Sequence, residues 1–382
     1  MWGSATTGVH PTSQQQGDKP TGMPGPSVDP PSRSFASDNA AGAHPAVLDA
    51  VVAANAGHCL AYGEDAHTAH CEEMFVGLFD AEVVTRLTFN GTGANVAALA
   101  CLMATHGGPN QAIVCSSWAH IHTDETAAPE RILSTKLVDV PSDDAKLTPD
   151  QLREAAAYRG QVHHAQPGVV SITQPTELGT LYTVDEIVAL CDTAHELGML
   201  VHLDGARIAN ATASLGGTRA ALRSFTIDAG VDAMSFGGTK VGSLGAEAVV
   251  FLNPEVAVGS EFVRKQVGQL PSKMRFLAAQ FSALLTDDLW LELGFHSNAM
   301  AELLHRRVAT LPGIDAGASP EVNSIFPALP ADLIEPLKAW SFFWDWNPAR
   351  HQVRWMTAWD TTPEDIDAFV AGIEEMTGRG AG

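Results

Sequence analysis

Short apolar runs alternate with helical segments along most of this chain, and this alternation constrains its fold more than any other feature. Helical stretches such as residues 96–103 and 184–197 separate several of the runs, and Thr183 and Glu186 match a capping box at the start of the second. Continuous apolar runs are typical of strands that helices cover on both faces. The pattern therefore predicts a mostly parallel, doubly wound α/β sheet. The predicted strands are residues 85–89, 112–115, 169–173, 200–203, 233–236 and 248–252.

The composition changes along the chain and predicts three regions. Residues 1–33 are rich in Pro, Gly, Ser, Thr and Gln, which is typical of a disordered tail. Residues 34–285 carry the strand and helix alternation and are predicted to form a large domain. Residues 286–382 combine a helix, short strand-like pieces and a last helix that begins after Thr362, so a smaller C-terminal α+β domain is predicted.

The charge and the cysteines exclude several classes of protein. Acidic residues outnumber basic ones by 44 to 22, and a net charge of −22 argues against nucleic acid as a partner. The five cysteines include no C-x-x-C pair, so neither a disulfide framework nor a zinc knuckle is indicated. No apolar run approaches the ~18 residues of a membrane span, and no secretion signal is evident. A cytoplasmic protein without a membrane partner is expected.

The first candidate site is a glycine-containing turn between a predicted strand and a helix. It reads Phe89-Asn90-Gly91-Thr92-Gly93 and leads into small apolar residues. Backbone N–H groups at such a helix start, together with the helix dipole, can bind a phosphate. The dinucleotide fingerprint fails, because its third glycine position holds a valine. A tight turn without any ligand is the alternative.

Two further candidates follow predicted strands directly. Asp204 and Arg207 come after the strand at residues 200–203, where open α/β sheets bind ligands. Lys240, one of only seven lysines, follows the strand at 233–236 among glycines and small residues. Such surroundings lower the pKa of an amine and suit a Schiff-base lysine. An exposed turn with an incidental ion pair and a loop lysine that reaches solvent are the respective alternatives.

Together, these motifs indicate a pyridoxal phosphate site. The lysine would bond to the cofactor, Asp204 would keep its pyridine nitrogen protonated, and the helix start at Gly91 would hold its phosphate. A ring should also stack on the cofactor, and His120 is the candidate, with His122 as its rival. A metal site formed by these two histidines and Glu125 has unfavourable spacing and no fourth ligand, so no metal is predicted.

The motifs, in this order, resemble those of the L-threonine aldolase family, among the fold-type-I pyridoxal phosphate enzymes. The resemblance extends from Ser37 to about Thr377 and is most specific at residues 90–95, 203–207 and 237–240. Residues 61–65, 173–180 and 272–276 look like the low-specificity bacterial branch, which includes phenylserine aldolases. The resemblance implies a fold-type-I, transferase-like large domain and a homo-oligomer, a dimer of dimers.

The resemblance also implies roles for individual residues. A neighbouring subunit's phosphate is the implied contact of Arg275, and the other roles concern the chain's own site. They are Lys240 for the covalent bond to the cofactor, Asp204 for the pyridine nitrogen, His120 for stacking, Gly91, Thr92 and Gly93 for the phosphate, Arg207 for cofactor and substrate, and Ser37 and Arg354 for the substrate carboxylate.

One position departs from the family pattern. Many members have a histidine, placed near the substrate hydroxyl, where this chain has Glu177. Either Glu177 takes over that polar role, or His120 acts alone through a water molecule. Both readings make these two residues candidates for the catalytic proton transfer.

The implied reaction is the retro-aldol cleavage of β-hydroxy-α-amino acids to glycine and an aldehyde. L-Threonine, L-allo-threonine and phenylserine are the implied substrates. Another fold-type-I reaction, β-elimination or transamination, is the alternative within enzymes. A nucleotide-binding regulatory α/β protein, in which Lys240 and Asp204 would be incidental, is the alternative outside them.

Overall fold

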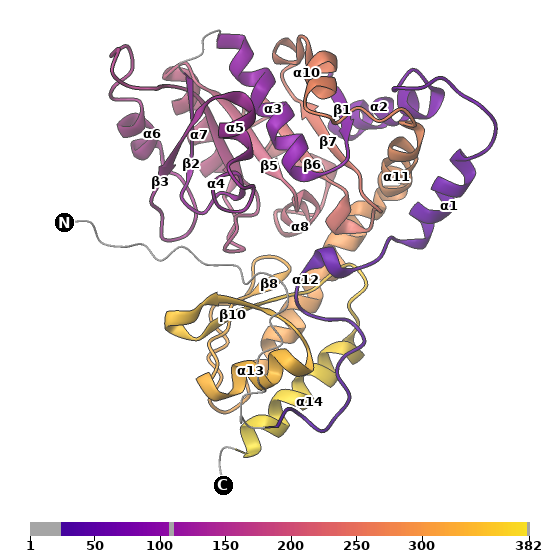
Figure 1. Cartoon of the computed structure of the whole chain (residues 1–382), viewed down its shortest axis with the longest axis vertical. Helices are drawn as coiled ribbons and strands as arrows, with labels where there is room; N and C mark the ends of the chain where they lie inside the picture. Colours follow the sequence, from indigo (N-terminus) through magenta and orange to yellow (C-terminus); the bar gives the residue numbers. More distant parts are fainter. Residues whose placement is uncertain (1–23, 107–110, 380–382) are drawn as a thin grey trace.

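The computed structural model describes residues 24–106 and 111–379. A seven-stranded sheet forms the centre of the large domain, in the order β1-β7-β6-β5-β4-β2-β3 (Figure 1). β7 is antiparallel to both of its neighbours and the other pairs are parallel, so all strands except β7 run in one direction. The strands are β1 (Val84–Thr88), β2 (Gln111–Ser116), β3 (Lys136–Val140), β4 (Gln166–Thr173), β5 (Leu200–Gly205), β6 (Ala233–Gly237) and β7 (Glu247–Phe251).

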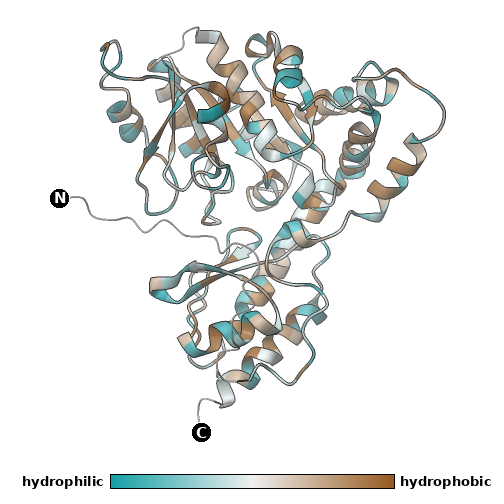
Figure 2. Cartoon of the chain, viewed as in Figure 1, coloured by the Kyte–Doolittle hydropathy of each residue, from teal (hydrophilic) through white to brown (hydrophobic). Residues whose placement is uncertain are grey.

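Helices cover both faces of this sheet, as its apolar strands predict. α3 packs on one face, where Ile113, Val169 and Val249 are buried, and the opposite core contains their chain neighbours Val114 and Val170. Figure 2 shows the apolar residues gathered along the sheet and the inner faces of the helices. The helices of this domain are α1 (Pro45–Ala54), α2 (Ala66–Phe79), α3 (Gly91–His106), α4 (His120–Thr123), α5 (Ala128–Leu133), α6 (Pro149–Ala155), α7 (Val184–Glu196), α8 (Ile208–Ser214), α9 (Arg219–Ser224), α10 (Ser260–Gln266) and α11 (Arg275–Leu285), with 3-10 turns η1 (Asp38–Ala40), η2 (Thr239–Val241), η3 (Pro254–Ala257) and η4 (Thr286–Asp288).

The smaller domain combines helices with a three-stranded sheet in the order β8-β10-β9. Its core contains Trp355, Phe343 and Phe369, whose rings contact one another. Among the described residues, no helix has both the length and the apolar character that crossing a membrane requires. The elements of this domain are α12 (Leu289–Val308), β8 (Ser324–Ile325), α13 (Ala331–Trp340), β9 (Trp344–Asn347), η5 (Pro348–Arg350), β10 (Gln352–Met356) and α14 (Pro363–Arg379).

The predicted strands and the sheet class are confirmed, but one edge strand was missed. β3 was not predicted because it is only partly buried and carries Lys136 and Asp139 among its apolar residues. An edge strand buries less surface than a central one, so its apolar pattern is weaker.

The predicted region boundaries need two corrections. Residues 1–23 of the predicted tail lie outside the described residues, but residues 24–33 contact the small domain. The backbone of Val28 accepts a hydrogen bond from Trp340, and Arg33 forms ion pairs with Asp360 and Asp365. Phe35, assigned to the large domain, is buried in the small domain's core. Composition does not show these partners, because they lie more than 300 residues away.

Candidate active site at the carboxyl edge of the sheet

Most of the predicted site residues follow different strands but lie at the same edge of the sheet. α3 begins at Gly91 after β1, His120 follows β2, and Glu177 follows β4. Asp204 is the second-last residue of β5, and Lys240 lies in η2 after β6. These strands run in one direction, so their carboxyl ends meet at one edge, where open α/β sheets bind ligands.

Asp204 is a buried carboxylate held by several donors. Its Oδ2 accepts a hydrogen bond from Asn95 Nδ2 at 2.8 Å, and its Oδ1 accepts one from the backbone N–H of Ala206 at 3.0 Å. Burial raises its pKa, but the charges of His120, His202 and Lys240 outweigh that effect and lower the pKa below its ordinary value. Asp204 is therefore a buried group that stays negatively charged.

His120 begins α4 and lies between two carboxyl groups. Its Nδ1 is 3.2 Å from Glu125 Oε1, and its backbone N–H donates to Glu177 Oε1 at 2.9 Å. Burial lowers the pKa of His120, but the hydrogen bond to Glu125 and the charge of Asp204 raise it above its ordinary value overall. Asn95 donates to Glu125 as well as to Asp204, so a single amide joins the surroundings of both residues.

Glu177 is held so that one of its oxygens has no partner. Its Oε1 accepts hydrogen bonds from the His120 backbone and from Thr173 Oγ1, both at 2.9 Å. Its Oε2 is buried and has no hydrogen-bond partner among the described residues. Burial raises the pKa of Glu177 to about 7. The carboxyl group can therefore gain or lose a proton near neutral pH.

Lys240 is half-buried, and its amine has no hydrogen bond or ion pair with any described residue. Burial and the charge of Arg207 lower its pKa below the ordinary value, against the opposing charges of Asp38 and Asp204. A lowered pKa increases the fraction of the uncharged, nucleophilic amine. Its surroundings therefore favour a lysine that reacts rather than one that pairs.

The first turn of α3 has its own side-chain cap. Asn90 Oδ1 accepts a hydrogen bond from Gly93 N–H at 2.8 Å, which leaves the N–H groups of Gly91 and Thr92 at the helix start. A Cβ atom on Gly93 would lie 2.2 Å from the amide of Gln269, whereas one on Gly91 would have nothing within 4 Å. A side chain at residue 93 would therefore displace the Gln269 side chain, whereas Gly91 leaves open space at the helix start.

Arg207 is clamped by a carboxylate that the sequence did not reveal. Its Nε and Nη2 donate to the two oxygens of Asp38, at 2.6 and 3.0 Å. The Arg207 charge holds the pKa of buried Asp38 below its ordinary value despite the opposing effect of burial. Asn323 donates to the same carboxylate, at 3.1 Å. Asp38 therefore joins the N-terminal segment to the large-domain site and to the small domain.

Arg354 in β10 contributes from the small domain. Its guanidinium lies over the ring of Trp346, 5.4 Å from the centroid, and its Nε is buried without a hydrogen-bond partner among the described residues. Burial and the charge of Arg207 lower its pKa to about 10. Arg354, Arg207 and Glu177 line the same small cavity, so the structure brings these three predicted residues together.

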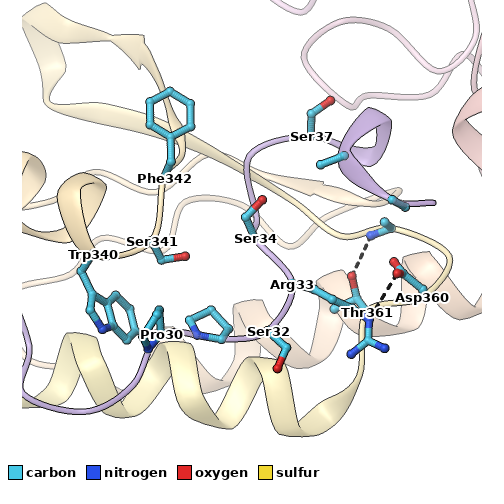
Figure 3. Close-up of a pocket in the computed structure, with 14 residues that line it drawn as sticks. Pro30, Ser32, Arg33, Ser34, Ser37, Trp340, Ser341, Phe342, Asp360 and Thr361 are labelled. Atoms are coloured by element: carbon cyan, nitrogen blue, oxygen red, sulfur yellow. Dashed lines mark hydrogen bonds and ion pairs between the residues drawn. The ribbon is translucent and has the colours of Figure 1, made fainter.

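Two predicted residues lie away from this group. Arg275 donates to the backbone oxygen of Gly57 at 3.2 Å and contacts Cys59, and no described contact joins it to Asp204 or Lys240. Ser37 lines a separate cavity of about 470 Å³ between the N-terminal segment and the small domain. Figure 3 shows Ser37 there together with Arg33, Trp340 and Asp360. This larger cavity is lined by none of the strand-edge residues.

The sequence reading missed three residues of this site: Asn95, Glu125 and Asp38. Asn95 belongs to the motif of the glycine turn, which was assigned to phosphate binding. Glu125 lies close to His120 and His122 and was considered only as a metal ligand. Asn95 comes one helical turn after Gly91, so it faces the same edge. Asp38 gave no such signal, because only folding brings it to Arg207.

Comparisons with known proteins agree with this site. The model of the beta-eliminating lyase family matches residues 34–329. The low-specificity L-threonine aldolase of Pseudomonas aeruginosa is 40% identical over 91% of this chain and 98% of its own length. A second one, from Pseudomonas sp. strain NCIMB 10558, is also 40% identical, over 90% of this chain and 98% of its own length.

Solved structures show the same fold. A threonine aldolase of Leishmania major superposes with a TM-score of 0.83 at 30% identity, covering 90% of this chain and 99% of that protein. A putative L-allo-threonine aldolase of Listeria monocytogenes has a TM-score of 0.69 at 15% identity, over 91% of this chain and 96% of its own, which supports the fold alone. These findings confirm the fold-type-I architecture and the resemblance predicted from the motifs. The chain belongs to the beta-eliminating lyase family and, within it, to the low-specificity L-threonine aldolases.

Proposed function

We propose that this protein is a pyridoxal 5'-phosphate-dependent aldolase that cleaves β-hydroxy-α-amino acids to glycine and an aldehyde. L-Threonine, L-allo-threonine and phenylserine are the proposed substrates. The observation that carries the proposal is the meeting of Asp204, His120 and an unpaired Lys240 at one strand edge, in a chain 40% identical to low-specificity L-threonine aldolases.

The residues at this edge fit pyridoxal phosphate. A carboxylate that stays ionised, as Asp204 does, matches a protonated pyridine nitrogen. The uncapped N–H groups and open space at Gly91 and Thr92 match a phosphate, with Gly93 shaping the turn. The Lys240 amine has no hydrogen bond or ion pair with any described residue, so it can react with the cofactor. The positive charge of Arg207 acts on this amine. His120 would stack on the ring.

Pyridoxal phosphate, when bound, supplies the electron sink that accepts the electron pair of the breaking Cα–Cβ bond. The chain must then hold the substrate and remove the hydroxyl proton. Arg354 would bind the substrate carboxylate through its unpaired Nε, and Arg207 would complete the site. Ser37, which the resemblance also implies for the carboxylate, lines the separate cavity of the N-terminal segment instead. Arg207 can contribute Nη1, because Asp38 takes its Nε and Nη2.

The hydroxyl proton would go to Glu177 Oε2. This oxygen is buried, has no partner among the described residues and belongs to a carboxyl group whose pKa is about 7. A base with a pKa near the working pH is the most effective one. His120 lies beside it, because its backbone N–H donates to the other oxygen of Glu177. His120 acting through a water molecule is the alternative proton acceptor.

The proposal includes a cytoplasmic homo-oligomer, a dimer of dimers, in which Arg275 reaches the phosphate of a neighbouring subunit. Arg275 lies beside the loop that carries Leu60, whose side chain is 66% exposed, and Val52 on nearby α1 is 74% exposed. Exposed apolar side chains of this kind are typical of interfaces. Light scattering should give a mass of four chains, and Arg275→Ala should weaken cofactor binding without changing that mass. A protein that is monomeric and still binds one cofactor per chain would contradict the proposed oligomer and the proposed role of Arg275.

The direct test combines Lys240→Ala with product analysis. We expect the purified parent to absorb in the visible range with bound cofactor and to release glycine and an aldehyde from threonine and phenylserine. Lys240→Ala should lose both the absorbance of the lysine-bound cofactor and turnover, whereas exposed Lys136→Ala should keep both. Release of ammonia and a 2-oxo acid instead of glycine would indicate β-elimination. A Lys240→Ala protein that cleaves threonine at the parent rate would refute the assignment.

A further inference from the structure

Three aromatic residues form a continuous contact between the two domains beside the proposed active site. Trp118 of the large domain and Trp346 of β9 are stacked, with ring centroids 6.1 Å apart and planes at 14°. Phe326 also contacts Trp346, with ring centroids 5.0 Å apart and planes tilted at 55°. All three side chains are half-buried, so part of each remains accessible. We call Trp118, Trp346 and Phe326 the aromatic stack.

The aromatic stack connects Arg354 of the small domain with the segment of the large domain that carries His120. At one end, the Arg354 guanidinium lies over Trp346, 5.4 Å from its centroid, and Phe326 lines the same cavity as Arg354, Arg207 and Glu177. At the other end, Trp118 comes two residues before His120, and its Nε1–H donates to the backbone oxygen of Ser142 at 2.8 Å. That hydrogen bond holds the indole in place.

The covalent structure of an amino acid then places its side chain. The carboxylate carbon and Cβ are both bonded to Cα, so a carboxylate bound at Arg354 keeps the β-substituent close to the residues packed around Arg354. The hydroxyl on the same Cβ must face the proton acceptor at Glu177 and His120. The β-substituent is thereby confined to the neighbourhood of Arg354, whose guanidinium lies over Trp346, and Trp346 in turn stacks on Trp118.

We propose that the aromatic stack determines substrate specificity and favours β-hydroxy-α-amino acids with an aromatic β-substituent over those with a methyl group. This inference rests on the proposed function. An aryl group gains apolar burial and ring contacts against indole and phenyl surfaces, which a methyl group cannot match. Trp346 also holds Arg354, so its loss weakens carboxylate binding for every substrate. The ratio between two substrates isolates the contact with the β-substituent.

The experiment compares kcat/KM for phenylserine and threonine in the holoenzyme of the parent, Trp346→Ala and Trp346→Phe. Trp346→Ala should lower the phenylserine-to-threonine ratio about tenfold, and Trp346→Phe should restore most of it. Trp344→Ala is the matched control, because Trp344 lies in the same strand but contacts Phe342, with centroids 5.0 Å apart. Its ratio should equal the parent's. An unchanged ratio in Trp346→Ala would overturn the proposal.

A second readout does not depend on turnover. L-Phenylalanine and L-alanine lack the β-hydroxyl and cannot undergo the cleavage, so their dissociation constants are measured by titrating the holoenzyme and following its absorbance. The parent should prefer phenylalanine, and Trp346→Ala should lose that preference.

If circular dichroism shows that Trp346→Ala does not fold, Trp118→Phe and Phe326→Leu serve for the same test. Unchanged preferences in both variants would overturn the proposal. A parent that releases no glycine from either substrate refutes the proposed function, whereas glycine release with equal ratios refutes only the role of the aromatic stack.

Discussion

At the scale of single residues, Glu177 is the proposed proton acceptor. The family resemblance implies a histidine at this position in many members, and burial raises the pKa of the Glu177 carboxyl group to about 7. That value lies close to the ordinary pKa of histidine. A buried glutamate at this position can therefore serve as a base in the same pH range as the imidazole it replaces.

We predict that Glu177→Gln removes the acid limb of the pH profile. The base must be ionised, so the parent's kcat/KM should fall as the pH drops through about 7, the pKa that burial gives Glu177. The variant should lose about a hundredfold or more in kcat, because the amide cannot accept the proton. Steady-state kinetics from pH 5.5 to 9 measure both effects.

The control for this prediction is Glu186→Gln, an exposed glutamate that pairs with Lys146 at 3.0 Å and lies in α7. Its profile should match the parent's. A Glu177→Gln protein that keeps both its rate and the acid limb would assign the proton transfer to His120 instead.

At the scale of elements, the turn from β1 into α3 combines close packing with the proposed phosphate site in one short segment. The Phe89 backbone N–H donates to Gln269 Oε1 at 2.9 Å, and the same Gln269 side chain lies against Gly93. The turn is thus held from outside by a residue that follows α10. Its two glycines serve different purposes, close packing at Gly93 and open space at Gly91.

We predict that Gly93→Ala destabilises the fold and that Gly91→Ala does not, although a methyl group at residue 91 would enter the space proposed for the phosphate. A Cβ at residue 93 would lie 2.2 Å from Gln269, so it must displace that side chain and break the hydrogen bond to Phe89. The free energy of unfolding should fall by about 1–3 kcal/mol, and the cofactor should bind more weakly. Gly91→Ala should unfold at nearly the parent temperature, because nothing lies within 4 Å of its added methyl group. Thermal unfolding and cofactor titration test both variants, and equal effects would contradict the packing argument.

At the scale of the whole molecule, the N-terminal segment connects the first and last parts of the described chain to the site. Phe35 packs on Phe369 with centroids 4.7 Å apart, and the Met356 N–H donates to the Phe35 backbone oxygen at 2.9 Å. Three residues later, Asp38 clamps Arg207. The segment thereby connects the small-domain core to Arg207, a residue of the proposed active site.

We predict that Arg33→Ala weakens this connection. Arg33 pairs with buried Asp365 at 3.0 Å, but its own side chain is 41% exposed, so the expected loss is about 1 kcal/mol of unfolding free energy. Burial raises the pKa of Asp365, but hydrogen bonds from Thr362 and then from Arg33 outweigh that effect and lower it below its ordinary value. These interactions, the ion pair with Arg33 among them, therefore stabilise the fold above the carboxylate's unfolded pKa. The difference between parent and variant should shrink as the pH falls through the folded pKa.

Urea unfolding at pH 7 and pH 3 measures this difference. Arg306→Ala is the control, because Arg306 and Glu302 form an ion pair with both side chains about 60% exposed, and it should cost less than about 0.5 kcal/mol. Equal losses in the two variants, or a larger loss at pH 3 than at pH 7 for Arg33→Ala, would contradict the role of Asp365.

The sequence by itself determined the sheet class, the family and the motifs at the strand ends. These are local properties: an apolar run, a glycine turn or an acid after a strand is complete within a few residues, and parallel strands bring such ends to one edge whatever the details of packing. Lys240, Asp204 and Gly91 could be named for that reason. Glu177 and Arg354 were named only through the family resemblance.

The tertiary structure alone decided which distant residues meet. Asp38 and Arg207 are 169 positions apart, and Arg33 and Asp365 are 332 apart. The aromatic stack joins two domains, and the place of Phe35 in the small-domain core depends on a surface that α12, β10 and α14 build together. Such contacts form no pattern along the chain, because burial and charge compensation depend on the complete three-dimensional surroundings of each side chain.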